Sequence, residues 1–116
     1  MKESVLKEKS FRFAVRIVNL YKYLCEEKKE FVMSKQVLKC GTSIGSNVRE
    51  AEYAESKADF IHKMAIALKE ANETVYWLEL LNATEYISSI EFESINNDAI
   101  ELIKLITSSK KTAQAQ

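Results

Sequence analysis

The fold of this chain is decided by the stretch QVLKCGTSIGSNVREA, residues 36–51. It contains both glycines of the protein, Gly41 and Gly45, and the chain has no proline. The five residues from Gly41 to Gly45 also match the G-x-S-x-G pattern of a hydrolase nucleophile turn, with Ser43 at its centre. The stretch is therefore either a catalytic turn or part of a helix, and the surrounding residues distinguish the two.

The residues before Ser43 favour a helix. A nucleophile turn follows a β-strand and needs a histidine base further along the chain. Here apolar and small residues recur at helical spacing instead, at Val37, Cys40, Gly41, Ile44, Val48 and Ala51. The one histidine, His62, falls on the polar side of the next predicted helix. We therefore expect no catalytic residues, and we expect that the protein is not an enzyme.

Two glycines inside a helix need a physical reason. Each costs about 0.5–1 kcal/mol relative to alanine in a helix interior. Gly41 and Gly45 are four residues apart, and small side chains lie between and beside them. We expect a neighbouring helix to pack closely against both glycines and so compensate for this cost. A break in the helix near Gly41 is the alternative.

Four segments of the chain show helical periodicity. We expect helices at about 10–27, 34–55, 56–83 and 90–108, with Ser10, Ser56 and Ser88 as N-terminal caps. The joints between them are short, so consecutive helices are antiparallel neighbours. The sequence predicts an all-α protein, an antiparallel up-down-up-down four-helix bundle. Residues 1–116 form a single domain in this prediction, with 1–9 and 109–116 frayed. An earlier turn of the first helix that includes Val5 and Leu6 is the alternative.

The first and third helices have wider apolar faces than a monomeric bundle needs. A surface helix needs an apolar stripe of about 100°, whereas apolar residues cover about half of the first helix. This surplus predicts self-association, and a helix buried at the centre of one bundle is the alternative. The residues that we assign to the contact between copies are Phe13, Ile17, Trp77 and Leu81.

Charge is balanced overall but polarised along the chain. There are 17 basic and 17 acidic residues, which argues against a wholly basic nucleic-acid binder. Residues 1–49 carry 11 basic and 5 acidic side chains, and residues 50–116 carry 6 and 12, so the halves have charges of +6 and −6. This polarity favours an anionic partner or head-to-tail assembly. Candidate phosphate contacts, for which a solvated helix face is the alternative, are Arg12, Arg16, Lys35 and Lys39.

The sequence predicts neither a cofactor nor a metal site. A di-iron bundle needs two Glu-x-x-His pairs, and this chain offers only Glu70 and Glu73 at that spacing. Cys25 and Cys40 both fall on apolar stripes. We therefore expect them to be reduced, buried thiols and the protein to be cytoplasmic. No apolar run approaches the ~18 residues of a membrane span, so we expect no membrane partner.

On the second predicted helix, Asn47 borders the apolar stripe and Arg49 lies further round. Arg49 can pair with a glutamate of the adjacent helix or of a second copy, or it can be solvated at the surface. If it pairs with a partly buried carboxylate, its role is to hold register, not to catalyse. The sequence leaves these alternatives open.

Two long stretches resemble a known family. They are KSFRFAVRIVNLYKYL at 9–24 and QVLKCGTSIGSNVREAEYAESKADFIHKMAIALKEANETVYWLELL at 36–81. They are similar to four-helix-bundle proteins first noticed as open reading frames in intervening sequences of bacterial 23S rRNA genes. The most specific parts are residues 42–51 and 69–78.

The resemblance implies a left-handed four-helix bundle that assembles into a homopentamer and has no established enzymatic activity. The related accessory proteins of diversity-generating retroelements form similar pentamers, bind nucleic acid and contact a reverse transcriptase. We therefore expect a non-enzymatic, self-assembling accessory factor that binds RNA or DNA. The alternative is a scaffold for a protein partner, which would use the acidic residues Glu79, Glu91 and Glu93.

Overall fold

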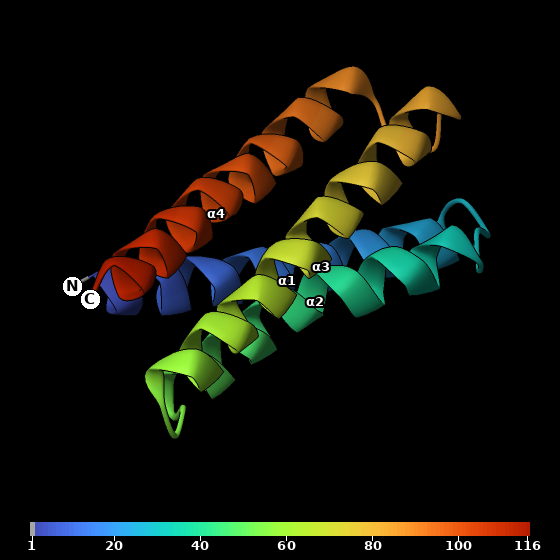
Figure 1. The fold of residues 1–116 in the computed structure, drawn as a ribbon. Helices are drawn as coiled ribbons and strands as arrows, with labels where there is room; N and C mark the ends of the chain where they lie inside the picture. The colour runs from blue at the N-terminus through green and yellow to red at the C-terminus, as the bar shows by residue number, and fades with distance from the viewer. Residues whose placement is uncertain (1) are drawn as a thin grey trace.

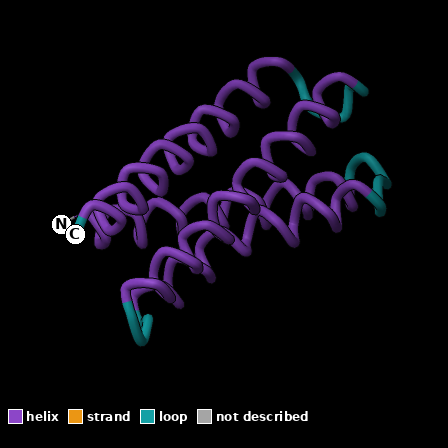
Figure 2. The backbone as a smooth tube through the Cα atoms, in the orientation of Figure 1, coloured by secondary structure: helices purple, strands orange, loops and turns teal. Residues whose placement is uncertain are grey.

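The computed structural model describes the backbone of residues 2–116 and the side chains of residues 5–116. It contains four helices, α1 (Lys2–Glu26), α2 (Met33–Glu52), α3 (Lys57–Ala83) and α4 (Ser89–Ala115), and within residues 2–116 there is no strand. The bundle measures 47 × 21 × 19 Å along its principal axes. Short loops join the helices at both ends (Figure 2).

Consecutive helices run in opposite directions (Figure 1). α2 lies between α1 and α3, and α4 closes the bundle by contacting both α3 and α1. Within residues 2–116 the diagonal pairs α1 with α3 and α2 with α4 make no close backbone contact. This arrangement is an antiparallel up-down-up-down four-helix bundle, and the predicted fold class is confirmed.

The helices of the two chain ends are longer than the sequence predicts. Residues 2–9 and 109–115, where we expected frayed ends, are helical. Ser10 is therefore no cap but a buried residue inside α1, and its hydroxyl donates to the carbonyl of Lys7 at 3.1 Å. Leu6 and Ala113 are buried in these outer turns. Burial of these two side chains stabilises turns whose local sequence is polar.

Serine caps begin α3 and α4 as predicted. Ser56 accepts a hydrogen bond from the backbone N–H of Asp59 at 3.0 Å. Ser88 and Glu91 form a reciprocal capping box at the start of α4. These caps account for why both helices begin within a residue of the predicted position.

A buried glutamate begins α2. The N-cap residue Val32 offers no side-chain acceptor. Instead, the Glu30 carboxylate accepts backbone N–H bonds from Val32, Met33 and Ser34 at 3.2, 3.0 and 2.7 Å. Burial raises the pKa of Glu30, but the hydrogen bonds donated to its carboxylate outweigh this effect and lower the pKa overall.

Close packing of α1 and α2 explains the two glycines. α2 is continuous through both, so the predicted alternative of a break near Gly41 is excluded. A Cβ at Gly41 would lie 2.7 Å from Cγ1 of Ile17, and one at Gly45 would lie 3.3 Å from the backbone oxygen of Ser10. The glycines therefore allow α1 to approach the backbone of α2 closely, as the sequence predicts.

Candidate interaction surfaces

Ser43 belongs to a helix and not to a nucleophile turn. Its hydroxyl donates to the carbonyl of Lys39 in the preceding helical turn at 2.6 Å. His62, the one histidine of the chain, is exposed on α3. The G-x-S-x-G match is therefore a coincidence of small residues that pack against α1.

The two cysteines are free thiols. Cys40 is buried, and this burial raises the pKa of its thiol to about 11. A thiol with such a pKa is almost wholly protonated at neutral pH and is a poor nucleophile. Cys25 is half-buried, with its sulfur 3.7 Å from Oγ of Ser34.

The carboxylate of Glu73 on α3 has a hydrogen-bond partner within the chain. The Glu73 carboxylate accepts a hydrogen bond from Nε1 of Trp77 at 3.3 Å. Across residues 5–116, no three side chains among His, Cys, Asp and Glu are close enough together to hold a metal ion. None of the helices in the described part of the chain is long and apolar enough to cross a membrane.

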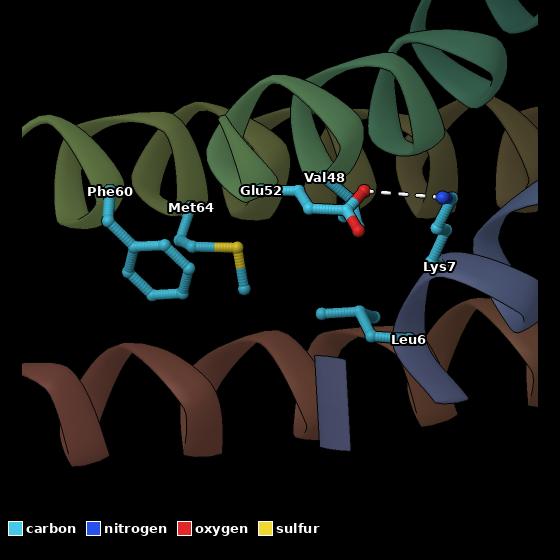
Figure 3. A pocket seen from close by; sticks show the side chains of 6 residues that line it. All are labelled: Leu6, Lys7, Val48, Glu52, Phe60 and Met64. Carbon is cyan, nitrogen blue, oxygen red and sulfur yellow. Dashed lines mark ion pairs between the residues drawn. The ribbon is translucent and has the colours of Figure 1, made fainter. Parts of the chain in front are cut away.

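A small cavity lies between the start of α1, the end of α2 and the start of α3 (Figure 3). Its volume of about 20 Å³ is close to that of one water molecule. Leu6, Val48, Phe60 and Met64 line it, and the ion pair between Lys7 and Glu52, at 3.3 Å, lies at its edge. A cavity of this size with apolar walls is a packing defect, not a ligand site.

A wider groove of about 510 Å³ separates the C-terminal half of α1 from the N-terminal half of α4. Its apolar walls include Leu20, Tyr23 and Ile95. Ile90 stands at its edge with 82% of its surface exposed. The groove is open and shallow, and no buried polar group points to a particular ligand.

The structure separates the four predicted phosphate contacts into two pairs. Arg12 forms an ion pair with Glu8 on the same helix. Arg16 reaches across to α4, where it contacts Oδ2 of Asp98 at 2.7 Å and Oγ of Ser94 at 3.0 Å. Both arginines therefore have their charges balanced within the chain.

The other two candidates are free. Lys35 and Lys39 are exposed and lie one turn apart on α2. The ammonium group of neither lysine takes part in any of the ion pairs or hydrogen bonds that residues 5–116 form. These two lysines are the more accessible half of the predicted phosphate-binding strip.

The predicted contact between copies needs correction. Phe13, Ile17 and Leu81 are at most 1% exposed within a single chain. Side chains without exposed surface cannot contact a second bundle, so this prediction is wrong for these three residues. Trp77 is half-buried and does reach the surface. There its ring packs edge-on against that of Tyr76, with 5.2 Å between the ring centroids.

Other apolar side chains occupy the surface instead. On α1, Phe11 and Val15 are 54% and 46% exposed, one turn apart. The guanidinium of Arg49, from α2, lies 5.3 Å from the centre of the Phe11 ring. We call Phe11, Val15 and Arg49 the α1 patch. The buried stripe of α1 is centred on Leu6, Phe13 and Ile17, which leaves Phe11 and Val15 of the wide apolar arc outside the core.

A second apolar surface lies on α3. Tyr76 is 56% exposed beside Trp77, and Glu73 and Glu70 lie about one and two turns before them. We call these four residues the α3 patch. Its charged members are acidic, whereas the charged member of the α1 patch is basic.

The amino-acid sequence of this chain matches a family model. The model of the 23S rRNA-intervening sequence protein family matches residues 2–108. The chain belongs to this family. It is also similar to a solved crystal structure, at 1.70 Å, of a protein of unknown function from the S23 ribosomal protein family of Bacteroides thetaiotaomicron VPI-5482. The two chains are 67% identical with a TM-score of 0.95, over 96% of this chain and 99% of the other. No curated protein matches the chain.

Membership of the 23S rRNA-intervening sequence protein family confirms the resemblance seen in the sequence. The two stretches that carry this resemblance most specifically, residues 42–51 and 69–78, lie on the adjacent helices α2 and α3. The first contains the glycine that contacts Ser10, together with Arg49. The second contains the whole α3 patch. These two stretches therefore contribute both to the packing inside one bundle and to its outer surface.

Proposed function

We propose that this protein is a non-enzymatic subunit that assembles with identical copies into a ring, with five copies as the family resemblance implies. The observation that supports the proposal is the pair of apolar patches left outside the core. They lie on α1 and α3, which are diagonal to one another in the bundle. Soluble monomers rarely leave large contiguous apolar surfaces exposed.

The two patches differ, and this difference favours a ring. A contact between unlike surfaces of identical chains repeats from copy to copy, and it closes when the rotation between neighbours allows. The charge asymmetry supports the same geometry, because the basic half of the chain forms α1 and most of α2 while the acidic half forms α3 and α4. Head-to-tail contact brings opposite charges together.

Native mass spectrometry and light scattering test the assembly. We expect a mass that is a multiple of 13.3 kDa at micromolar concentration, five-fold for the ring that the resemblance implies. Val15→Asp places a charge in the α1 patch without touching the core, so we expect it to reduce the mass toward one chain. A wild-type mass of 13.3 kDa across the whole concentration range would refute the proposal.

Nucleic-acid binding is a second candidate function. The observation in its favour is the free, exposed pair Lys35 and Lys39, which a ring would repeat in every copy. Lysines placed in this way contact phosphates without reading sequence. The neutral net charge limits the expected affinity.

Filter binding to fragments of 23S rRNA over a salt series tests this candidate. We expect weak binding that falls as salt rises, because phosphate contacts release counterions. The double variant K35A/K39A should weaken binding to all sequences, and the slope of the salt dependence should fall by about one for each phosphate that the protein no longer reaches. Arg12→Ala is the matched control, since Glu8 already neutralises that charge.

The same experiment separates the nucleic-acid function from the scaffold alternative. An absence of binding at low salt, or binding that salt does not change, would contradict phosphate contacts. Protein partners that remain bound to the assembly after nuclease treatment would then favour a scaffold, with Glu79 and Glu93 exposed for the contact.

A further inference from the structure

Arg49 is held in place but lacks a carboxylate partner. Its guanidinium stacks against the ring of Phe11, and none of the ion pairs that residues 5–116 form includes it. A stacked guanidinium keeps its N–H donors free at its edge. The sequence left two partners open, and within residues 5–116 of the same chain the structure shows no carboxylate paired with Arg49.

Glu70 is the matching acidic group. Its side chain is half-buried on α3, and its carboxylate takes no part in any hydrogen bond or ion pair formed within residues 5–116. The neighbouring Glu73 differs, because it already accepts the indole N–H of Trp77. Glu70 is therefore the free carboxylate of the α3 patch.

Contacts through α2 show that these two groups lie at the same height in the bundle. Gly45 lies against Ser10 of α1, and Cys40 lies against Thr74 of α3. Since α2 and α3 are antiparallel, the five residues from Cys40 to Gly45 correspond to about 7.5 Å, or about four to five residues back along α3 from Thr74. That distance leads to Glu70, which is thus level with Ser10 and its neighbour Phe11.

Rotation about the axis of a ring preserves height along that axis. When bundles stand side by side around the axis, the Phe11–Arg49 pair of one copy faces the level of Glu70 in the next. α1 and α3 run in the same direction, so Val15, one turn beyond Phe11, then faces the level of Glu73 and Thr74, just before Tyr76 and Trp77. Opposite charges meet at one end of this contact and apolar side chains meet at the other.

We infer that Arg49 of one copy forms an ion pair with Glu70 of the neighbouring copy, and that this pair sets the register in which the α1 patch covers the α3 patch. The inference rests on the proposed function, because it names the surfaces through which the ring is built. Arg49 then positions one chain against the next. The cation–π contact with Phe11 holds the guanidinium of Arg49 in place for this pair.

A charge swap tests the pairing. We expect Arg49→Glu and Glu70→Arg each to raise the concentration at which half the assembly dissociates by about tenfold or more, because each places like charges opposite one another. The double variant R49E/E70R should restore assembly toward the wild-type level. Native mass spectrometry over a dilution series measures all four proteins, and Arg49→Gln, which adds no repulsion, should show a smaller effect than Arg49→Glu.

Two further variants control for charge alone. Lys104→Glu and Glu93→Arg make the same charge changes at exposed positions of α4, outside both patches, and should leave the assembly unchanged. Circular dichroism melts show whether each variant retains its helices.

Each outcome bears on the pairing. A monomeric wild type overturns the ring and the pairing together. An assembled wild type that Arg49→Glu does not weaken overturns the pairing alone. Single variants that dissociate while the double variant does not recover would also overturn it, since Glu70 would then not be the partner.

Discussion

α1 packs against α2 through small residues and against α4 through charged ones. At the α1–α2 contact, Ile17 and Ser10 lie against the glycines of α2. At the α1–α4 contact, Lys9 pairs with Glu101 at 3.0 Å, and Arg16 pairs with Asp98 at 2.7 Å. Figure 1 shows α1 and α4 diverging from the end of the bundle where the two termini lie. The groove of about 510 Å³, which Arg16 lines, lies between the two helices.

This difference shows how side-chain size sets the distance between helices. Positions without a side chain allow two backbones to approach, so neighbouring side chains become fully buried and contribute dispersion contacts. Long charged side chains hold two helices further apart and stay partly in water, where an ion pair contributes little stability. We therefore expect a substitution that overfills the α1–α2 contact, as at Gly41, to affect stability more than the loss of an ion pair at the α1–α4 contact.

The largest effect is expected for Gly41→Val. Its Cβ would lie within 3.0 Å of three carbon atoms of Ile17, which is too close for van der Waals contact. Overpacking of this kind costs about 1–3 kcal/mol, or a fall in melting temperature of about 5–15 °C. Thermal denaturation followed by circular dichroism measures the change.

A paired substitution identifies the cause of that loss. Ile17→Ala removes the carbon atoms that clash, so the double variant I17A/G41V should lose less stability than the sum of the two single variants. Strictly additive losses would show that Gly41 serves some purpose other than packing against Ile17.

The next largest effect is expected in the loop between α1 and α2, where the Glu30 carboxylate accepts the backbone N–H bonds at the start of α2. Glu30→Gln should lower stability by about 1–2 kcal/mol at neutral pH, because a buried carboxylate that accepts backbone N–H bonds becomes a neutral amide. The loop between α3 and α4, which borders the groove, is closed by the exposed Glu91. Glu91→Gln is therefore the control with the smaller expected loss.

The pH dependence of this effect follows from the direction of the pKa shift. The pKa of Glu30 is lower in the folded chain than the value of about 4.3 expected in the unfolded chain. Its contribution is thus fully present above about pH 4.3 and is lost as the pH falls through the folded pKa. Urea denaturation between pH 3 and pH 7 should show wild type and Glu30→Gln converging toward the acid end, and a constant difference would contradict this role of Glu30.

Much of this fold follows from local sequence. The absence of proline, the four periodic segments and the caps Ser56 and Ser88 predict the helices and their order. The packing of Gly41 and Gly45 also follows, because two glycines in a helix need compensation. These features depend on residues close together in the chain.

The outer surface was harder to predict, since it depends on which way each helix is rotated about its axis. The apolar arc of α1 is wide enough that either Phe13 or Phe11 can face the core. Contacts with α2 and α4 decide in favour of Phe13, and only the structure contains them. Similarly, the sequence marks Arg16 as a free cation, whereas the tertiary fold brings Asp98 and Ser94 to it from 82 and 78 residues away.

A smaller effect is expected at the α1–α4 contact. Arg16→Ala removes the ion pair with Asp98, in which both side chains are at least 40% exposed, so the loss should be about 0.2–1 kcal/mol. The loss should shrink in 1 M salt because exposed ion pairs are screened. Urea denaturation at two salt concentrations measures it, with the exposed Lys104→Ala as control. A loss above about 2 kcal/mol that salt does not change would show that the α1–α4 contact contributes as much to stability as the α1–α2 contact.

The smallest effect is expected for Gly45→Ala, which tests whether both glycines set the distance between α1 and α2. Alanine gains about 0.5–1 kcal/mol of helix propensity over glycine, and its Cβ would lie 3.3 Å from the backbone oxygen of Ser10. The neighbouring backbone needs to move by only a few tenths of an ångström, so we expect a net change within about 0.5 kcal/mol in either direction. Gly41→Ala has the same gain but places its Cβ 2.7 Å from Ile17, so it should be the less stable of the two in a thermal melt. Equal losses of stability in the two variants would show that both glycines set the distance between α1 and α2. A loss in Gly41→Ala alone would show that this distance is set where Ile17 packs against Gly41.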